Sequence, residues 1–88
     1  MTIYIHFHQP GNPTSEKQKE ALEAVIQDPE FKKVGAYRVT WETERPLQKA
    51  YQVSAPATVV VFKGEDEKSR AIGATDPKLL KQVLLQGL

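Results

Sequence analysis

The sequence predicts a single α/β domain, residues 1–88, in which the elements follow the order β-α-β-α-β-β-α. Three observations predict it: strand-like and helix-like segments alternate along most of the chain, a short turn at residues 63–66 joins the last two strand-like segments, and 88 residues suffice for one core. Strands separated by helices form parallel crossovers, whereas a tight turn makes its two strands antiparallel. We therefore expect a four-stranded mixed sheet with helices on both faces.

The first half of the chain contains two predicted strands and one helix. Residues 3–7 alternate apolar with semi-apolar side chains, which is typical of a central strand covered on both faces. Residues 9–13 hold two prolines and a glycine and must form a loop. A helix with one apolar stripe begins at Thr14 and ends before Pro29. Residues 34–41 are rich in β-branched and aromatic side chains and form the second strand.

The second half contains a short helix, a hairpin and a last helix. Residues 42–53 have apolar side chains at near-helical spacing, and a first turn capped by Thr43 would tolerate a proline. Residues 57–62 are the most strand-like stretch, and residues 67–72 return as the second arm of a hairpin. The last helix is capped by Thr75 or Asp76.

Composition and charge exclude several classes of function. The formal net charge is +1 and 40% of the residues are hydrophobic, as in ordinary globular proteins. The longest apolar run, residues 59–62, is too short to cross a bilayer, and the first residues lack the pattern of a signal peptide. No Gly-rich phosphate loop is present, and Lys32 and Lys33 make too small a basic patch for nucleic acid. We expect a cytoplasmic protein that binds neither nucleic acid nor membranes.

The two histidines do not predict a metal site. His6 and His8 are two residues apart, so they lie on one side of a strand, but no third ligand is near in sequence. Phe31, Tyr37 and Trp41 are most simply aromatic residues of the core or its edge.

Four segments resemble the thioredoxin family in their order and spacing: residues 7–10, 28–31, 55–64 and 72–75. The resemblance covers almost the whole chain. It implies the minimal thioredoxin fold, without the additional N-terminal strand and helix of full thioredoxins.

The chain departs from this family in the active-site loop. Thioredoxins carry Trp-Cys-x-x-Cys there, and the aligned residues here are Gly11, Asn12, Pro13, Thr14 and Ser15. Asn12 and Ser15 replace the two cysteines, and the chain contains no cysteine at all. Disulfide exchange needs a thiolate to attack and a second sulfur to resolve the mixed intermediate. A serine cannot replace either, since a helix N-terminus contributes only about 0.3–2 kcal/mol toward an anion. We expect no catalytic residue, no cofactor and no oxidoreductase activity.

The polar residues of the loop have two compatible interpretations. Asn12 or Thr14 could be an N-cap, with Pro13 in the first helical turn. The free backbone N–H groups at the helix start could also bind an anion or a thiolate.

The resemblance also implies a groove formed by the loop, by Ala55 and Pro56, and by the turn at Gly73 and Ala74. In thioredoxins the proline that corresponds to Pro56 is cis, and the residue before it pairs its backbone with an extended substrate segment. A cis Ala55–Pro56 bond is therefore implied, while a purely structural proline fits the residues as well. If the family pattern holds, a peptide or protein segment adds here as a strand.

Three functions fit these residues. The first is a non-catalytic binding or scaffold module that uses the groove. The second is a glutathione-binding protein similar to glutathione transferases, in which Ser15 or Asn12 contacts the ligand thiol and Ala55-Pro56 holds the ligand backbone. The third is an engineered cysteine-free oxidoreductase, although Cys→Asn is not the usual laboratory change. The oligomeric state stays open.

Overall fold

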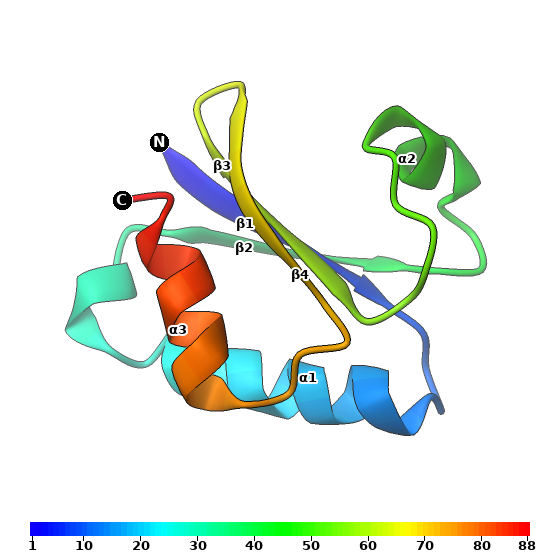
Figure 1. Cartoon of the computed structure of the whole chain (residues 1–88), viewed down its shortest axis with the longest axis horizontal. Helices are drawn as coiled ribbons and strands as arrows, with labels where there is room; N and C mark the ends of the chain where they lie inside the picture. Colours follow the sequence, from blue (N-terminus) through cyan, green and yellow to red (C-terminus); the bar gives the residue numbers. More distant parts are fainter.

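The computed structural model describes all residues from 1 to 88 and contains four strands, three α-helices and one 3-10 turn. In chain order these are β1 (Thr2–His8), α1 (Pro13–Val25), η1 (Pro29–Phe31), β2 (Gly35–Thr40), α2 (Arg45–Ala50), β3 (Thr58–Lys63), β4 (Asp66–Ile72) and α3 (Pro77–Leu85). The strands lie in the order β2-β1-β3-β4 (Figure 1). β1 and β2 are parallel, and the other two pairs are antiparallel. The predicted order of elements and the mixed sheet are confirmed.

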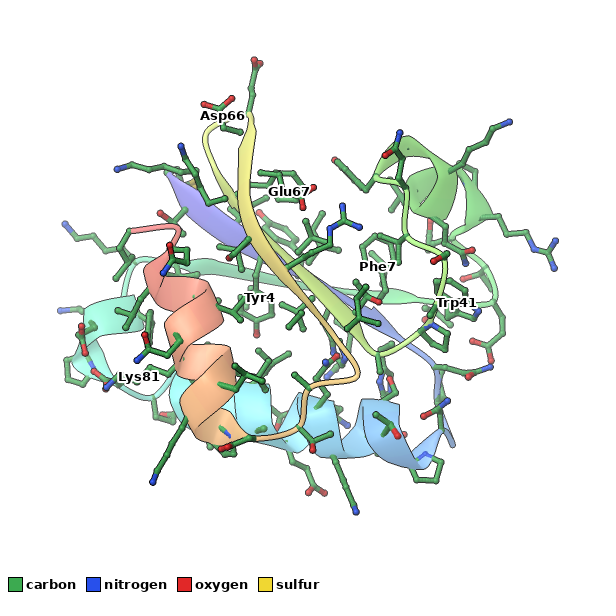
Figure 2. All side chains as sticks on the ribbon, viewed as in Figure 1. Tyr4, Phe7, Trp41, Asp66, Glu67 and Lys81 are labelled. Atoms are coloured by element: carbon green, nitrogen blue, oxygen red, sulfur yellow. The ribbon has the colours of Figure 1, made fainter.

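The sheet separates two hydrophobic clusters, because successive side chains of a strand point to opposite faces. Tyr4 lies on the face covered by α1 and α3, where it packs with Leu22 and Leu80 (Figure 2). Ile5 and Phe7 lie on the other face, which α2 and the residues around it cover. β1 is therefore buried on both faces, as its pattern predicted. No helix combines the length and the apolar character that crossing a bilayer requires.

Side-chain caps fix where α1 and α3 begin. The Asn12 carboxamide accepts a hydrogen bond from the Ser15 amide, and Pro13 occupies the first helical turn. Asp76 caps α3 through the Lys78 amide. The sequence offered Asn12 or Thr14 as the cap of the first helix and Thr75 or Asp76 as the cap of the last. The structure shows that Asn12 and Asp76 are the caps.

The second helix is shorter than predicted. It spans Arg45–Ala50 instead of residues 42–53, and its N-cap residue, Glu44, makes no side-chain cap. The amides of Thr43 and Glu44 instead donate to the carbonyl of Thr40, which forms a turn directly after β2. The expectation that Thr43 caps this helix is therefore wrong.

Tyr37 is not a core residue. Its side chain is 54% exposed, whereas Phe31 is buried and Trp41 is half-buried. Tyr37, Val39 and Trp41 alternate along β2, which is an edge strand of the sheet. Of these three residues, only Val39 and Trp41 pack against the hydrophobic cluster on the α2 face. The aromatic character of Tyr37 could not reveal this, because strand order is a tertiary property.

The implied cis bond before Pro56 is wrong, since the structure contains no cis peptide bond. The trans form is favoured for X-Pro bonds by about 0.5–1 kcal/mol. Here the chain turns at Ala57, whose φ of 58° lies in the left-handed region. The Ala57 amide donates to the carbonyl of Phe7 at 2.9 Å, which leads the chain directly into β3.

Candidate functional site

The loop that corresponds to the thioredoxin active site is held by Ser15. Its side chain is 0% exposed. Ser15 Oγ lies 2.7 Å from His8 Nδ1 and accepts a hydrogen bond from the Gln9 amide at 2.9 Å. All these atoms are satisfied when the hydroxyl donates to Nδ1 of the imidazole. Ser15 therefore fastens the start of α1 to the end of β1.

The other nitrogen of His8 faces Glu16. His8 Nε2 lies 3.4 Å from Glu16 Oε2, and the same carboxylate oxygen accepts a hydrogen bond from the Gly11 amide at 3.2 Å. The Gly11 N–H, together with His8 and Lys19, lowers the pKa of the Glu16 carboxyl. The carboxylate is thus held in its charged form over the loop.

Serine, histidine and glutamate in contact resemble the composition of a hydrolase triad, but the geometry differs. In such triads the nucleophile bonds to Nε2, and the carboxylate bonds to Nδ1. Here Ser15 is on Nδ1 and Glu16 faces Nε2. Ser15 is also fully buried, with its hydroxyl oxygen bonded to a backbone amide, so it presents no accessible nucleophile. The set stabilises the loop.

Asn12 is likewise engaged within the loop. Its Oδ1 caps α1, and its Nδ2 donates to Gln9 Oε1 at 3.0 Å. Gly11, which stands in the place of the family's tryptophan, is exposed and has a φ of 84°. No atom lies within 4 Å of the place where a Cβ of this glycine would be. The loop surface beside Gly11 is therefore open.

Gln18 brings the remaining groove segments together. Its Nε2 donates to the carbonyls of Ala57 and Ala74, each at 2.9 Å. The Gly73 amide also donates to the Ala57 carbonyl at 2.8 Å. The segments before β3 and after β4 are therefore joined to each other and to α1 by one buried side chain.

Two buried atoms beside this junction have no hydrogen-bond partner, His6 Nε2 and Gln18 Oε1. Burial, reinforced by His8 and Arg38, lowers the pKa of His6 from 6.5 to about 4, and Gln18 opposes the change. His6 is thus a neutral residue at pH 7. The rings of His6 and His8 lie 5.2 Å apart between centroids, and no group of three metal-ligating side chains surrounds them.

Removing the Gln18 amide should destabilise the fold. We expect Gln18→Leu to lower the free energy of unfolding by about 2 kcal/mol, since the buried Ala57 carbonyl and the partly buried Ala74 carbonyl each lose a donor at about 1 kcal/mol. The substitution also removes the unpartnered Oε1, which limits the cost. Urea unfolding measures the change. The matched control is Gln27→Leu on the exposed end of the same helical region, where we expect less than about 0.5 kcal/mol. Equal effects of the two substitutions would contradict this role of Gln18.

A cavity of about 770 Å³ opens beside the loop, on the α2 side. The residues that line it come from the ends of β1 and β2, from α2 and from the segment before Pro56: Gln9, Trp41, Glu42, Arg45, Gln48, Lys49, Gln52, Val53 and Ser54. Trp41 lies at the far end of β2, near α2 (Figure 2). Its carbonyl accepts a hydrogen bond from the Gln48 side chain, which ties α2 to this corner.

The sequence analysis did not identify these residues as a site. None of the predicted groove residues lines the cavity, although Gln9 and Ser54 are close neighbours of that groove in the chain. One signal was present: Trp41 directly follows the strand parallel to β1, and ligands of α/β sheets bind at the carboxyl ends of such strands.

The backbone of the segment before Pro56 is partly unpaired. Neither the amides of Ser54 and Ala55 nor the carbonyl of Ser54 makes a hydrogen bond within the chain, and Ser54 is exposed. The Ala55 carbonyl accepts only the Thr58 hydroxyl, at 2.8 Å. Unpaired backbone groups therefore lie next to the cavity, just before the bend at residues 55–57.

No protein-family model and no curated protein sequence matches the chain. Among solved structures, Trxlp from Edwardsiella tarda EIB202 superposes with a TM-score of 0.90 at 20% identity, over 94% of this chain and 81% of that one. Thioredoxin Mala s 13 from Malassezia sympodialis gives 0.84 at 21% identity, over 98% and 76%. Mitochondrial thioredoxin 3 from Saccharomyces cerevisiae gives 0.81 at 18% identity, over 96% and 76%.

The chain has a thioredoxin fold. At these identities the similarity concerns the fold alone, and the sequence departs from the Cys-x-x-Cys pattern of thioredoxins because it contains no cysteine. Within the thioredoxin fold, Asn12 and Ser15 lie at the start of the helix that follows the first strand of this chain, where both make hydrogen bonds.

Proposed function

We propose that this chain is a non-catalytic binding module that holds an extended peptide segment of a partner protein at the corner of the sheet between Gly11, Ser54 and Trp41. The observation that carries the proposal is the unpaired backbone of Ser54 and Ala55 beside an open cavity. An extended peptide gains main-chain hydrogen bonds by adding to such an edge, and adjacent pockets select its side chains.

The loop supports binding rather than catalysis. The Asn12 and Ser15 side chains are engaged in hydrogen bonds with neighbouring residues, and the chain has no cysteine for disulfide exchange. Gly11 leaves open the space that the family's tryptophan would fill. A partner segment can therefore approach the loop beside Gly11.

The lining of the cavity indicates the chemistry of the segment. Trp41 offers an aromatic surface, and Arg45 and Lys49 supply two cations against the single acid, Glu42. The volume of about 770 Å³ lies within the usual range of about 300–1,000 Å³ for ligand pockets. We infer that the partner segment carries at least one acidic side chain next to an apolar one.

A peptide titration followed by NMR tests this proposal. The probe is a hexapeptide of alternating valine and glutamate, and the comparison is the valine and lysine version. We expect the acidic peptide to shift the Ser54 and Ala55 amides and the Trp41 indole at millimolar concentration. The double variant Arg45→Glu, Lys49→Glu should bind about thirtyfold more weakly, since two attractive pairs of about 0.5 kcal/mol each are lost and two repulsive pairs of similar size replace them.

The matched control is Lys63→Glu, Lys68→Glu on the hairpin, which makes the same charge change away from the cavity. Equal weakening by both double variants would show that the peptide responds only to the net charge of the chain and not to the cavity. Unchanged spectra with both peptides at millimolar concentration would reject the proposal.

The glutathione alternative has less support from the geometry. Ser15 Oγ is buried with two partners and Asn12 Oδ1 caps the helix, so a ligand thiol would have to displace these bonds. Titration with glutathione separates the two ideas. Shifts at the Asn12, Ser15 and Ala55 amides would favour thiol binding, and their absence would exclude it.

A further inference from the structure

The chain segment that leads out of α2 is fastened to the sheet by Arg70 of β4. Arg70 Nη2 donates to the Tyr51 carbonyl at 2.8 Å, and Nη1 donates to the Gln52 carbonyl at 3.2 Å. Neither carbonyl accepts a hydrogen bond from a backbone amide. The last carbonyls of a helix have no partner within the helix and need donors from elsewhere. Arg70 supplies these donors.

Glu67 holds the guanidinium of Arg70 in place. Its two carboxylate oxygens accept hydrogen bonds from Nε and Nη2 of Arg70, both at 2.7 Å. A two-pronged contact of this kind fixes the orientation of the planar guanidinium as well as its position. The side chain of Arg70 is only 27% exposed. The other edges of the guanidinium are therefore directed at the end of α2.

An irregularity of β4 makes this pair possible. Residues three apart in a regular strand point to opposite faces, so Glu67 and Arg70 would not meet. The pairing of β4 with β3 skips Lys68, which leaves Glu67 opposite Phe62 and Arg70 opposite Val60. Phe62 and Val60 belong to the cluster on the α2 face. The extra residue thus turns both charged side chains toward α2, and re-aiming a side chain is a common role of such bulges.

The other contacts of this segment with the sheet are apolar. The Tyr51 ring lies 5.2 Å from the Phe62 ring between centroids, and Val53 is buried. Gln52 lies between them with a φ of 54°, in a region that residues other than glycine rarely adopt and that the surrounding structure must hold. Apolar contacts are not directional, whereas hydrogen bonds fix the backbone. The hydrogen bonds that join this segment to the sheet come from Arg70.

We propose that Arg70 is a positioning residue of the peptide site: held by Glu67, it fixes the backbone of residues 51–54 and so presents the unpaired groups of Ser54 and Ala55. The inference rests on the proposed peptide binding for its functional meaning. Arg70 is not among the residues that line the cavity. It acts through the segment and not by touching the peptide.

Nitrogen-15 relaxation of the full chain tests whether Arg70 fixes the segment. Arg70→Met keeps an apolar side chain of similar reach and removes the donors. We expect the order parameters of the Gln52 and Ser54 amides to fall from about 0.85 to below about 0.6. The matched control is Lys68→Met, which makes the same charge change at an exposed residue of the same strand and should leave these values unchanged. Unchanged order in Arg70→Met would overturn the proposal.

The peptide titration separates this inference from the proposed function. We expect Arg70→Met to bind the acidic hexapeptide about tenfold more weakly, since a mobile segment must be ordered on binding, and Lys68→Met to stay within about twofold of the parent chain. If the parent binds and Arg70→Met binds equally well, the positioning role is wrong and the proposed function stands. If the parent does not bind, the proposed function and the role in peptide binding both fail, while the relaxation data still decide whether Arg70 fixes the segment.

Glu67→Gln tests the part of the carboxylate. Glutamine keeps an oxygen acceptor but loses the charge, and Arg70 keeps both carbonyl partners. We therefore expect a smaller loss of order at Gln52 and Ser54 than in Arg70→Met. A larger loss in Glu67→Gln would mean that Glu67 holds the segment, and the role assigned to Arg70 would be wrong.

Discussion

The free energy of unfolding should fall by about 3 kcal/mol between pH 6.5 and pH 4, because His6 resists protonation in the folded state. Its pKa is lowered from 6.5 to about 4, chiefly by burial and then by His8 and Arg38. Each unit of pKa corresponds to about 1.4 kcal/mol, so protonating His6 costs the folded chain about 3 kcal/mol.

The sign follows from where the proton binds. In the unfolded chain His6 takes up its proton below pH 6.5, while in the folded chain it stays neutral down to about pH 4. The unfolded state therefore binds more protons in this window, and its stability relative to the folded state rises as the pH falls. Above pH 6.5 this contribution to folding is fully present.

Urea unfolding from pH 7 to pH 5 measures the effect, and about 2 kcal/mol of the total is lost by pH 5. Measuring no lower than pH 5 limits the contribution of carboxylates such as Asp28 and Glu67, because their lowered pKa values mean that they take up protons at lower pH. The control is His6→Leu, which removes the titrating group from a place where Nε2 has no partner. An equally steep decline in His6→Leu would show that another group is responsible.

Restoring both sulfurs should give this chain a disulfide reductase activity that we do not expect of the present, cysteine-free sequence. In Asn12→Cys, Ser15→Cys the first thiol would lie at the half-exposed N-cap of α1, where the helix dipole favours a thiolate. The second would lie buried one helical turn later, in place to resolve the mixed disulfide. We expect insulin reduction by dithiothreitol to be accelerated by the double variant and not by the present chain.

The substitution has a cost in stability. Losing the Asn12 cap and the Ser15 to His8 hydrogen bond should lower the stability of the reduced variant by about 2 kcal/mol. The control is Asn12→Cys alone, which can form a mixed disulfide but cannot resolve it. Mass spectrometry shows whether the double variant forms an internal disulfide. If it does and still fails to reduce insulin, then this site lacks more than the two sulfurs that catalysis requires. Insulin reduction by the cysteine-free chain would contradict the expectation that this reaction requires the two cysteines.

The elements that the sequence predicted well are those whose signals are local. The alternation in residues 3–7 gives β1, the apolar run before Lys63 gives β3, and Asn12 followed by Pro13 gives the start of α1. The second helix was predicted too long at both ends. At its start the Thr43 and Glu44 amides donate to the Thr40 carbonyl, and at its end Gln52 has a φ of 54°, although apolar side chains keep a near-helical spacing as far as Val53.

The candidate site was predicted only in part, because its contacts join residues far apart in the chain. The sequence singled out Asn12 and Ser15 as replacements, but not that Ser15 bonds to His8 or that Gln18 reaches Ala57 and Ala74. A glutamine in a helix carries no signal of a partner 39 or 56 residues away.

By itself the sequence determined the order of elements and the absence of any cysteine thiol, since periodicity and residue identity act locally and need no partner. Only the tertiary structure decided the trans bond before Pro56, the exposure of Tyr37 and the cavity beside Trp41. These depend on which strands become edges and which backbone groups find partners across the fold, and burial and hydrogen bonding between distant segments settle that.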